Sequence, residues 1–85
     1  MSPEHGARRS RVIMVEPALT QLTKLTASET HRLDRAIVAI SANPELGAPV
    51  PGTLLRDYTD DVDGVRVIFY VTAFQTITIV AYVEA

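Results

Sequence analysis

The chain contains no cysteine, so a disulfide framework or a thiolate metal site cannot form within its 85 residues. Its longest unbroken apolar runs, Val67 to Val71 and Ile79 to Val83, are far too short to span a bilayer. The N-terminal stretch MSPEHGARRSR carries arginines with no apolar segment behind them, which differs from a signal peptide. These absences predict a soluble chain that has no membrane association, and they agree with a cytoplasmic location.

Excess basic charge is also lacking. Eight lysines and arginines stand against ten aspartates and glutamates, which gives a net charge of −2. No broad positive field is available to attract nucleic acid, so any RNA or DNA role must depend on a few local cations. The acidic residues crowd one connection late in the chain, at Asp57, Asp60, Asp61 and Asp63.

Motifs for metals and nucleotide cofactors are absent as well. If Asp61, Asp63 and Gly64 are aligned with an EF-hand loop, Thr59 and Tyr70 fall where carboxylates are needed. The chain has no G-x-G-x-x-G sequence and no phosphate loop. The sequence therefore predicts no metal site and no small-molecule cofactor.

What is present is a regular succession of short elements. A hydrophobic content of 47% is that of a globular domain, which we place at residues 11–85 behind a flexible lead at 1–10. Thr26 and Glu29 stand at capping-box spacing, and Asn43-Pro44 ends the helix that they begin. The predicted elements are strand 11–16, helix 17–25, the capped helix, a Pro/Gly-rich loop at 44–52, and strands 54–58, 65–72 and 76–83.

This order, β-α-α-β-β-β, predicts an α+β fold. We expect an antiparallel helix hairpin packed on one face of a mainly antiparallel four-stranded sheet.

Strand parity assigns Arg66 to a particular face. Val65, Val67 and Phe69 alternate with Arg66 and Tyr70, so the apolar set is expected to face the helices and Arg66 to face away. In the last strand the same rule expects Thr76, Thr78, Val80, Tyr82 and Glu84 on the face of Arg66.

A hairpin in which these mixed faces coincide predicts a register. The predicted pairs are Arg66 with Tyr82, Ile68 with Val80, and Tyr70 with Thr78. An arginine flanked by tyrosines on an open sheet face is suited to binding phosphate and stacking bases. The alternative is a solvated sheet face on which the arginine packs against an aromatic ring.

The stretch GVRVIFYV, Gly64 to Val71, and the junction VEPALTQLTKL that begins at Val15 resemble the RelE/ParE superfamily of toxins from type II toxin–antitoxin systems. The resemblance covers residues 11–85. It implies a toxin that is neutralised in a hetero-oligomer with a cognate antitoxin. In the RelE and YoeB branches the toxin is a metal-independent endoribonuclease that cleaves mRNA on the ribosome. Alternatives within the resemblance are a ParE-like toxin that poisons gyrase, and a degenerate domain that only binds its antitoxin.

The resemblance also implies roles for individual residues. Arg66 occupies the arginine position of the motif and would stabilise the phosphate. The His-Tyr pair that ends YoeB-like chains is replaced here by Glu84 and Ala85, so the acid and base are either rebuilt from Tyr82 and Glu84 or missing. The predicted catalytic residues are Arg66, Tyr82 and Glu84, and the predicted substrate-binding residues are Arg56, Tyr70 and Thr78.

Overall fold

The computed structural model describes residues 11–72 and 77–85. Its elements are β1 (Arg11–Met14), α1 (Ala18–Leu22), α2 (Ala27–Ala42), the 3₁₀ turn η1 (Pro44–Leu46), β2 (Ala48–Pro49), β3 (Arg56–Asp60), β4 (Val65–Val71) and β5 (Ile77–Glu84). The predicted α+β class is confirmed. The predicted N-terminal lead and the loop after β4 lie outside the described residues.

The strands form one mixed sheet in the order β1-β5-β4-β3-β2. β1 runs parallel to β5, and the other neighbours are antiparallel. The predicted count of four strands is wrong, because Ala48–Pro49 pairs with β3 inside the segment that was expected to be a loop. A proline is tolerated there because β2 is an edge strand, where a missing N–H breaks no inner ladder.

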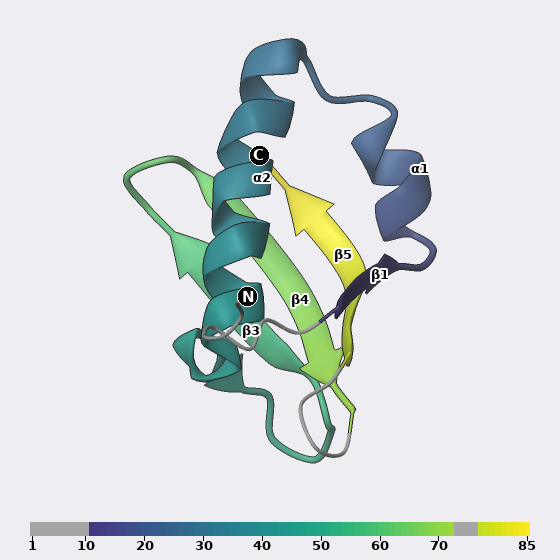
Figure 1. Cartoon of the computed structure of the whole chain (residues 1–85), viewed down its shortest axis with the longest axis vertical. Coiled ribbons are helices and arrows are strands. Elements are labelled where there is room, and N and C mark those ends of the chain that lie inside the picture. Colours follow the sequence, from purple (N-terminus) through teal and green to yellow (C-terminus); the bar gives the residue numbers. More distant parts are fainter. Residues whose placement is uncertain (1–10, 73–76) are drawn as a thin grey trace, which may run out of the picture.

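The α2 helix begins as the sequence predicts. The Thr26 hydroxyl accepts a hydrogen bond from the Glu29 N–H at 3.1 Å, and the Glu29 carboxylate accepts one from the Thr26 N–H at 2.8 Å. α1 is shorter than expected and ends at Leu22. Both helices lie on the same face of the sheet, α1 against β5 and α2 against β4 (Figure 1).

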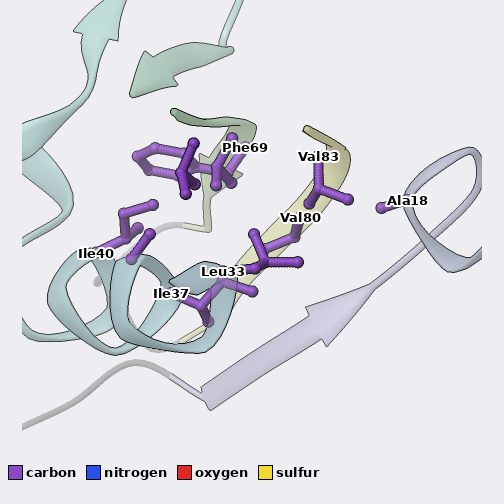
Figure 2. Close-up of a cluster of buried hydrophobic side chains, with 10 residues drawn as sticks. Ala18, Leu33, Ile37, Ile40, Phe69, Val80 and Val83 are labelled. Atoms are coloured by element: carbon purple, nitrogen blue, oxygen red, sulfur yellow. The ribbon is translucent and has the colours of Figure 1, made fainter. Parts of the chain in front are cut away.

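The core lies between these helices and the sheet. Phe69, at the centre of β4, is fully buried, together with Leu33 and Ile40 from α2. Figure 2 shows these side chains converging with Val80 and Val83 of β5 and with Ala18 of α1. Parity in β4 is therefore as predicted, since Val65, Val67 and Phe69 all point to the helices.

Parity in β5 is not as predicted. Val80 and Val83 are both buried although they are three residues apart, and the β4–β5 register shifts between Ile68 and Phe69. A bulge that inserts Ala81 explains both observations, because one extra residue reverses the alternation that follows it. The observed pairs are Arg66 with Glu84, Ile68 with Tyr82, and Val71 with Thr78, so the predicted register is wrong.

Candidate functional site

The face of the sheet opposite the helices is divided into an apolar part and a charged part. Its residues follow from the register. Ile13, Tyr70, Ile77 and Ile79 lie toward one end, where Arg11 pairs with Ile77, and Asp57, Thr59, Arg66, Tyr82 and Glu84 lie toward the other, where Ile68 sits between Asp57 and Tyr82. No pocket is hollowed into residues 11–72 and 77–85, so this face is an open surface.

Arg66 is the centre of the charged part. Its Nη2 donates to Asp57 Oδ2 at 2.7 Å, and its Nε donates to both carboxylate oxygens at 3.2 and 3.3 Å. The side chain of Arg66 stays 42% exposed, so an incoming group can reach it. This fork is the geometry with which arginine holds carboxylates and phosphates, and an anionic ligand must therefore compete with Asp57.

Tyr82 and Glu84 lie beside this ion pair. The Tyr82 hydroxyl donates to Glu84 Oε2 at 2.6 Å, and the Arg66 Cζ atom lies 6.0 Å from the centre of the Tyr82 ring. The predicted proximity of Arg66, Tyr82 and Glu84 is thus present, with Glu84 rather than Tyr82 directly opposite the arginine. The bulge accounts for this exchange.

The protonation states of the cluster follow from these contacts. The hydrogen bond from Arg66 holds the pKa of Asp57 below its ordinary value of 3.8. The ion pair is therefore charged at neutral pH and is lost only in acid, as the pH falls through that lowered pKa. The hydrogen bond to Glu84 raises the pKa of Tyr82 above its ordinary value of 10.0. Tyr82 consequently stays a phenol that can donate a proton at neutral pH.

Two predicted substrate-binding residues lie elsewhere. Arg56 pairs with Phe69 on the helix side of the sheet, and its Nη1 donates to the Gly47 carbonyl at 2.6 Å. Thr78 is fully buried among the core residues because the bulge in β5 reverses its side. The expectation that Thr78 lies on the open face is wrong, and Arg56, which was predicted to bind substrate, points to the helix side of the sheet. Tyr70 does lie there, beside Ile79 and away from the charged part.

The position of Thr78 has a measurable consequence. Its buried Oγ1 has no hydrogen-bond partner in the structure. Thr78→Val should raise the free energy of unfolding by about 1–2 kcal/mol, because a methyl group replaces an unpaired buried hydroxyl of similar shape. Urea unfolding measures this, with the exposed Thr59→Val as the matched control, for which we expect a change within about 0.5 kcal/mol. A destabilised Thr78→Val protein would contradict the core position.

Asp57 is the residue of the cluster that sequence reasoning missed. The acidic connection was visible, but Asp57 belongs to β3 and not to the turn, and it points to the same side as Arg66. The predicted strand 54–58 also contained Asp57. Alternation along that strand would have placed the Asp57 side chain on the other face of the sheet from those of Arg56 and Tyr58. The missing information was the pairing of β3 with β4, which sets Thr59 opposite Arg66 and Asp57 opposite Ile68.

Neither a protein-family model nor a curated protein matches the sequence. Within the described residues, no group of three or more His, Cys, Asp or Glu side chains is placed to hold a metal ion. None of the helices in that part of the chain has the length and apolarity to cross a membrane.

The chain is therefore a two-layer α+β domain whose open sheet face carries an Arg–Asp–Tyr–Glu cluster. Solved structures identify the fold more closely as that of RelE toxins. The toxin in the intact E. coli RelBE toxin–antitoxin complex is similar at 19% identity with a TM-score of 0.73, over 88% of this chain and 94% of that one. A RelBE toxin–antitoxin complex from Mycobacterium tuberculosis gives 18% identity and a TM-score of 0.68, over 89% and 96%.

A third similar structure includes a piece of an antitoxin. It is an E. coli RelE double mutant in complex with a RelB peptide, with 20% identity and a TM-score of 0.72 over 91% of this chain and 86% of that one. The fold implied by the RelE/ParE resemblance is thereby confirmed over nearly the whole chain.

Proposed function

We propose that this chain is the toxin of a type II toxin–antitoxin system, and that it inhibits translation by cleaving mRNA on the ribosome. The observation that carries the proposal is the convergence of Arg66, Tyr82 and Glu84 on the open sheet face of a RelE fold. An open surface suits a substrate that is presented by a larger body, such as the ribosome.

Each of the three side chains can supply one part of RNA cleavage. The ribose 2′-OH attacks the adjacent phosphorus, and its proton passes to the Glu84 carboxylate. Arg66 stabilises the charge that builds on the phosphoryl oxygens. The bond to the 5′ oxygen breaks, and the Tyr82 phenol, which is protonated at neutral pH, donates a proton to that leaving oxygen. The products are a cyclic phosphate and a free 5′-hydroxyl, and no metal takes part.

A second candidate is favoured by the Arg66–Asp57 pair. The guanidinium is already neutralised by Asp57, and Glu84 and the acidic β3–β4 turn add further negative charge nearby. Such surroundings weaken the attraction of an RNA phosphate. In this candidate the domain acts through protein contact, either on gyrase or only on its antitoxin.

The proposed partner in both candidates is a cognate antitoxin in the cytoplasm, and the similar RelE structures in complex with RelB support this. The isoleucines on the open face, among them Ile13 at 40% exposure, give an apolar surface for one antitoxin segment. Because the adjoining part of the face is acidic, we expect that segment to carry a basic residue that meets Asp57 or Glu84.

Expression in growing cells tests the proposal. We expect induction of the wild-type chain to arrest growth and to generate new 5′ ends within translated mRNA, mapped by primer extension. Co-expression of its cognate antitoxin should prevent both effects. Arrest without new 5′ ends would reject mRNA cleavage and favour the second candidate, whereas absence of arrest would reject toxicity itself.

A further inference from the structure

The C-terminal half of β5 lacks a strand neighbour on one side. β1 pairs with β5 only as far as Met14 and Val80, after which the Val15 N–H donates to the Val80 carbonyl at 3.0 Å. Beyond Val80, no strand of the described residues continues along that edge. The backbone N–H of the buried Val83 therefore needs another acceptor, since an unpaired buried N–H is costly.

Gln21 of α1 supplies that acceptor. Its side-chain Oε1 accepts the hydrogen bond from the Val83 N–H at 2.9 Å, across 62 residues of sequence. α1 is itself held against the sheet, because Ala18 is fully buried and packs with the core (Figure 2). Figure 1 shows α1 beside β5. The amide of Gln21 thus ties the helix to the strand segment that follows the bulge.

This segment carries two members of the site cluster. Val83 points into the core, while its neighbours Tyr82 and Glu84 point to the open face and are hydrogen-bonded to each other. A bulge loosens the ladder locally, so the orientation of these two side chains depends on what holds the Val83 backbone. We propose that Gln21 is a positioning residue for the Arg66–Tyr82–Glu84 cluster, acting from the opposite face of the sheet through the Val83 N–H.

The test measures the ionisation of Tyr82, which depends on the position of its hydroxyl beside Glu84. In a Tyr58→Phe/Tyr70→Phe background, Tyr82 is the only tyrosine, and its ionisation is followed by ultraviolet absorbance. We expect the titration midpoint to lie above 10.0 in this background and to fall toward 10.0 in Gln21→Met, which keeps the side-chain length but lacks the acceptor. Gln21→Glu retains an acceptor oxygen and should restore the higher midpoint. Thr23→Ala, which removes a hydrogen bond at the end of α1 without touching Val83, is the matched control and should leave the midpoint unchanged.

Amide hydrogen exchange at Val83 shows whether the bond has been broken, and urea unfolding shows whether each variant is folded. A midpoint that stays high in Gln21→Met although the Val83 amide has lost its protection would overturn the proposal. If Gln21→Met does not fold, Gln21→Ser, whose side chain is too short to reach the Val83 N–H, takes its place with the same expectations.

The expected effect of Gln21→Met on catalysis rests on the proposed mRNA cleavage, whereas its expected effect on the titration of Tyr82 does not. If wild-type cleaves mRNA, Gln21→Met should lower kcat by about ten- to a hundredfold with little change in KM, because misplaced catalytic groups affect the reaction step. Gln21→Glu should recover most of that loss. Failure of wild-type to cleave would refute the proposed function and leave the positioning of Tyr82 to be decided by the titration alone.

Discussion

Arg66→Ala should lower the rate of ribosome-dependent mRNA cleavage by about 10²- to 10³-fold, the usual effect of removing one preorganised group that stabilises developing charge. The physical reason is that Arg66 is the guanidinium of the open-face cluster and lies within reach of both Tyr82 and Glu84. Purified protein with programmed ribosomes gives the rate by quantitative primer extension. The growth arrest in cells should weaken in parallel.

A matched control is available for this substitution. Arg35 is also an exposed arginine in a short ion pair, with its Nη2 2.6 Å from Asp63 Oδ2, but it extends from α2 toward the β3–β4 turn. Arg35→Ala removes the same charge and a similar contact, and it should change stability little because exposed ion pairs contribute little to it. Since Arg35 extends from α2 and not from the open face, we expect cleavage within about twofold of wild-type. Equal losses in Arg35→Ala and Arg66→Ala would show that net charge, and not the site, governs the rate. Unchanged cleavage in Arg66→Ala would exclude the catalytic role.

Phe69→Ala should destabilise the domain by about 3–5 kcal/mol. Phe69 is fully buried at the centre of β4, and its ring contacts the segment at Gly47, where an added Cβ would come within 2.8 Å of the ring atoms. A domain of this size has a total stability of roughly 4–13 kcal/mol, so the loss is a large fraction of the whole. Urea unfolding followed by circular dichroism measures it, with a large decrease in the midpoint expected.

Val38→Ala is the control for the loss of apolar volume. Val38 lies on α2 but is 48% exposed, so its truncation leaves no cavity, and we expect a change within about 0.5 kcal/mol. Comparable losses in both variants would mean that Phe69 does not occupy the centre of the core. A Phe69→Ala chain that is unfolded even without urea agrees with the prediction, whereas a change below about 1 kcal/mol contradicts it.

The sequence predicted correctly those features that depend only on residues within one helix or strand. The capping box at Thr26 and Glu29 and the end of that helix at Asn43-Pro44 were both predictable from neighbouring residues. Alternation in β4 was readable for the same reason, and it placed Arg66 on the open face. The RelE/ParE resemblance of GVRVIFYV then led to the fold that the similar structures confirm.

Parity failed in β5 because the bulge at Ala81 is a property of two strands together. Within the chain, Thr78 and Val80 look like members of one mixed face, and nothing in their neighbours marks an extra residue. The side of Arg56 could not be assigned for a related reason, since it depends on how β3 pairs with β4 and β2. These errors concern which side chains share a face, whereas the missed strand β2 is an error about which elements exist.

The sequence by itself determined the order of the two helices and the four longer strands, the helix-covered core and the exposure of Arg66, because each depends on periodicity and on contacts between near neighbours. Only the tertiary structure decided that Asp57 forms an ion pair with Arg66, that Glu84 lies opposite Arg66, and that Thr78 belongs to the core. These facts depend on register between strands that are distant in sequence. A shift of one residue reverses every side chain beyond it, and local patterns do not record where that shift occurs.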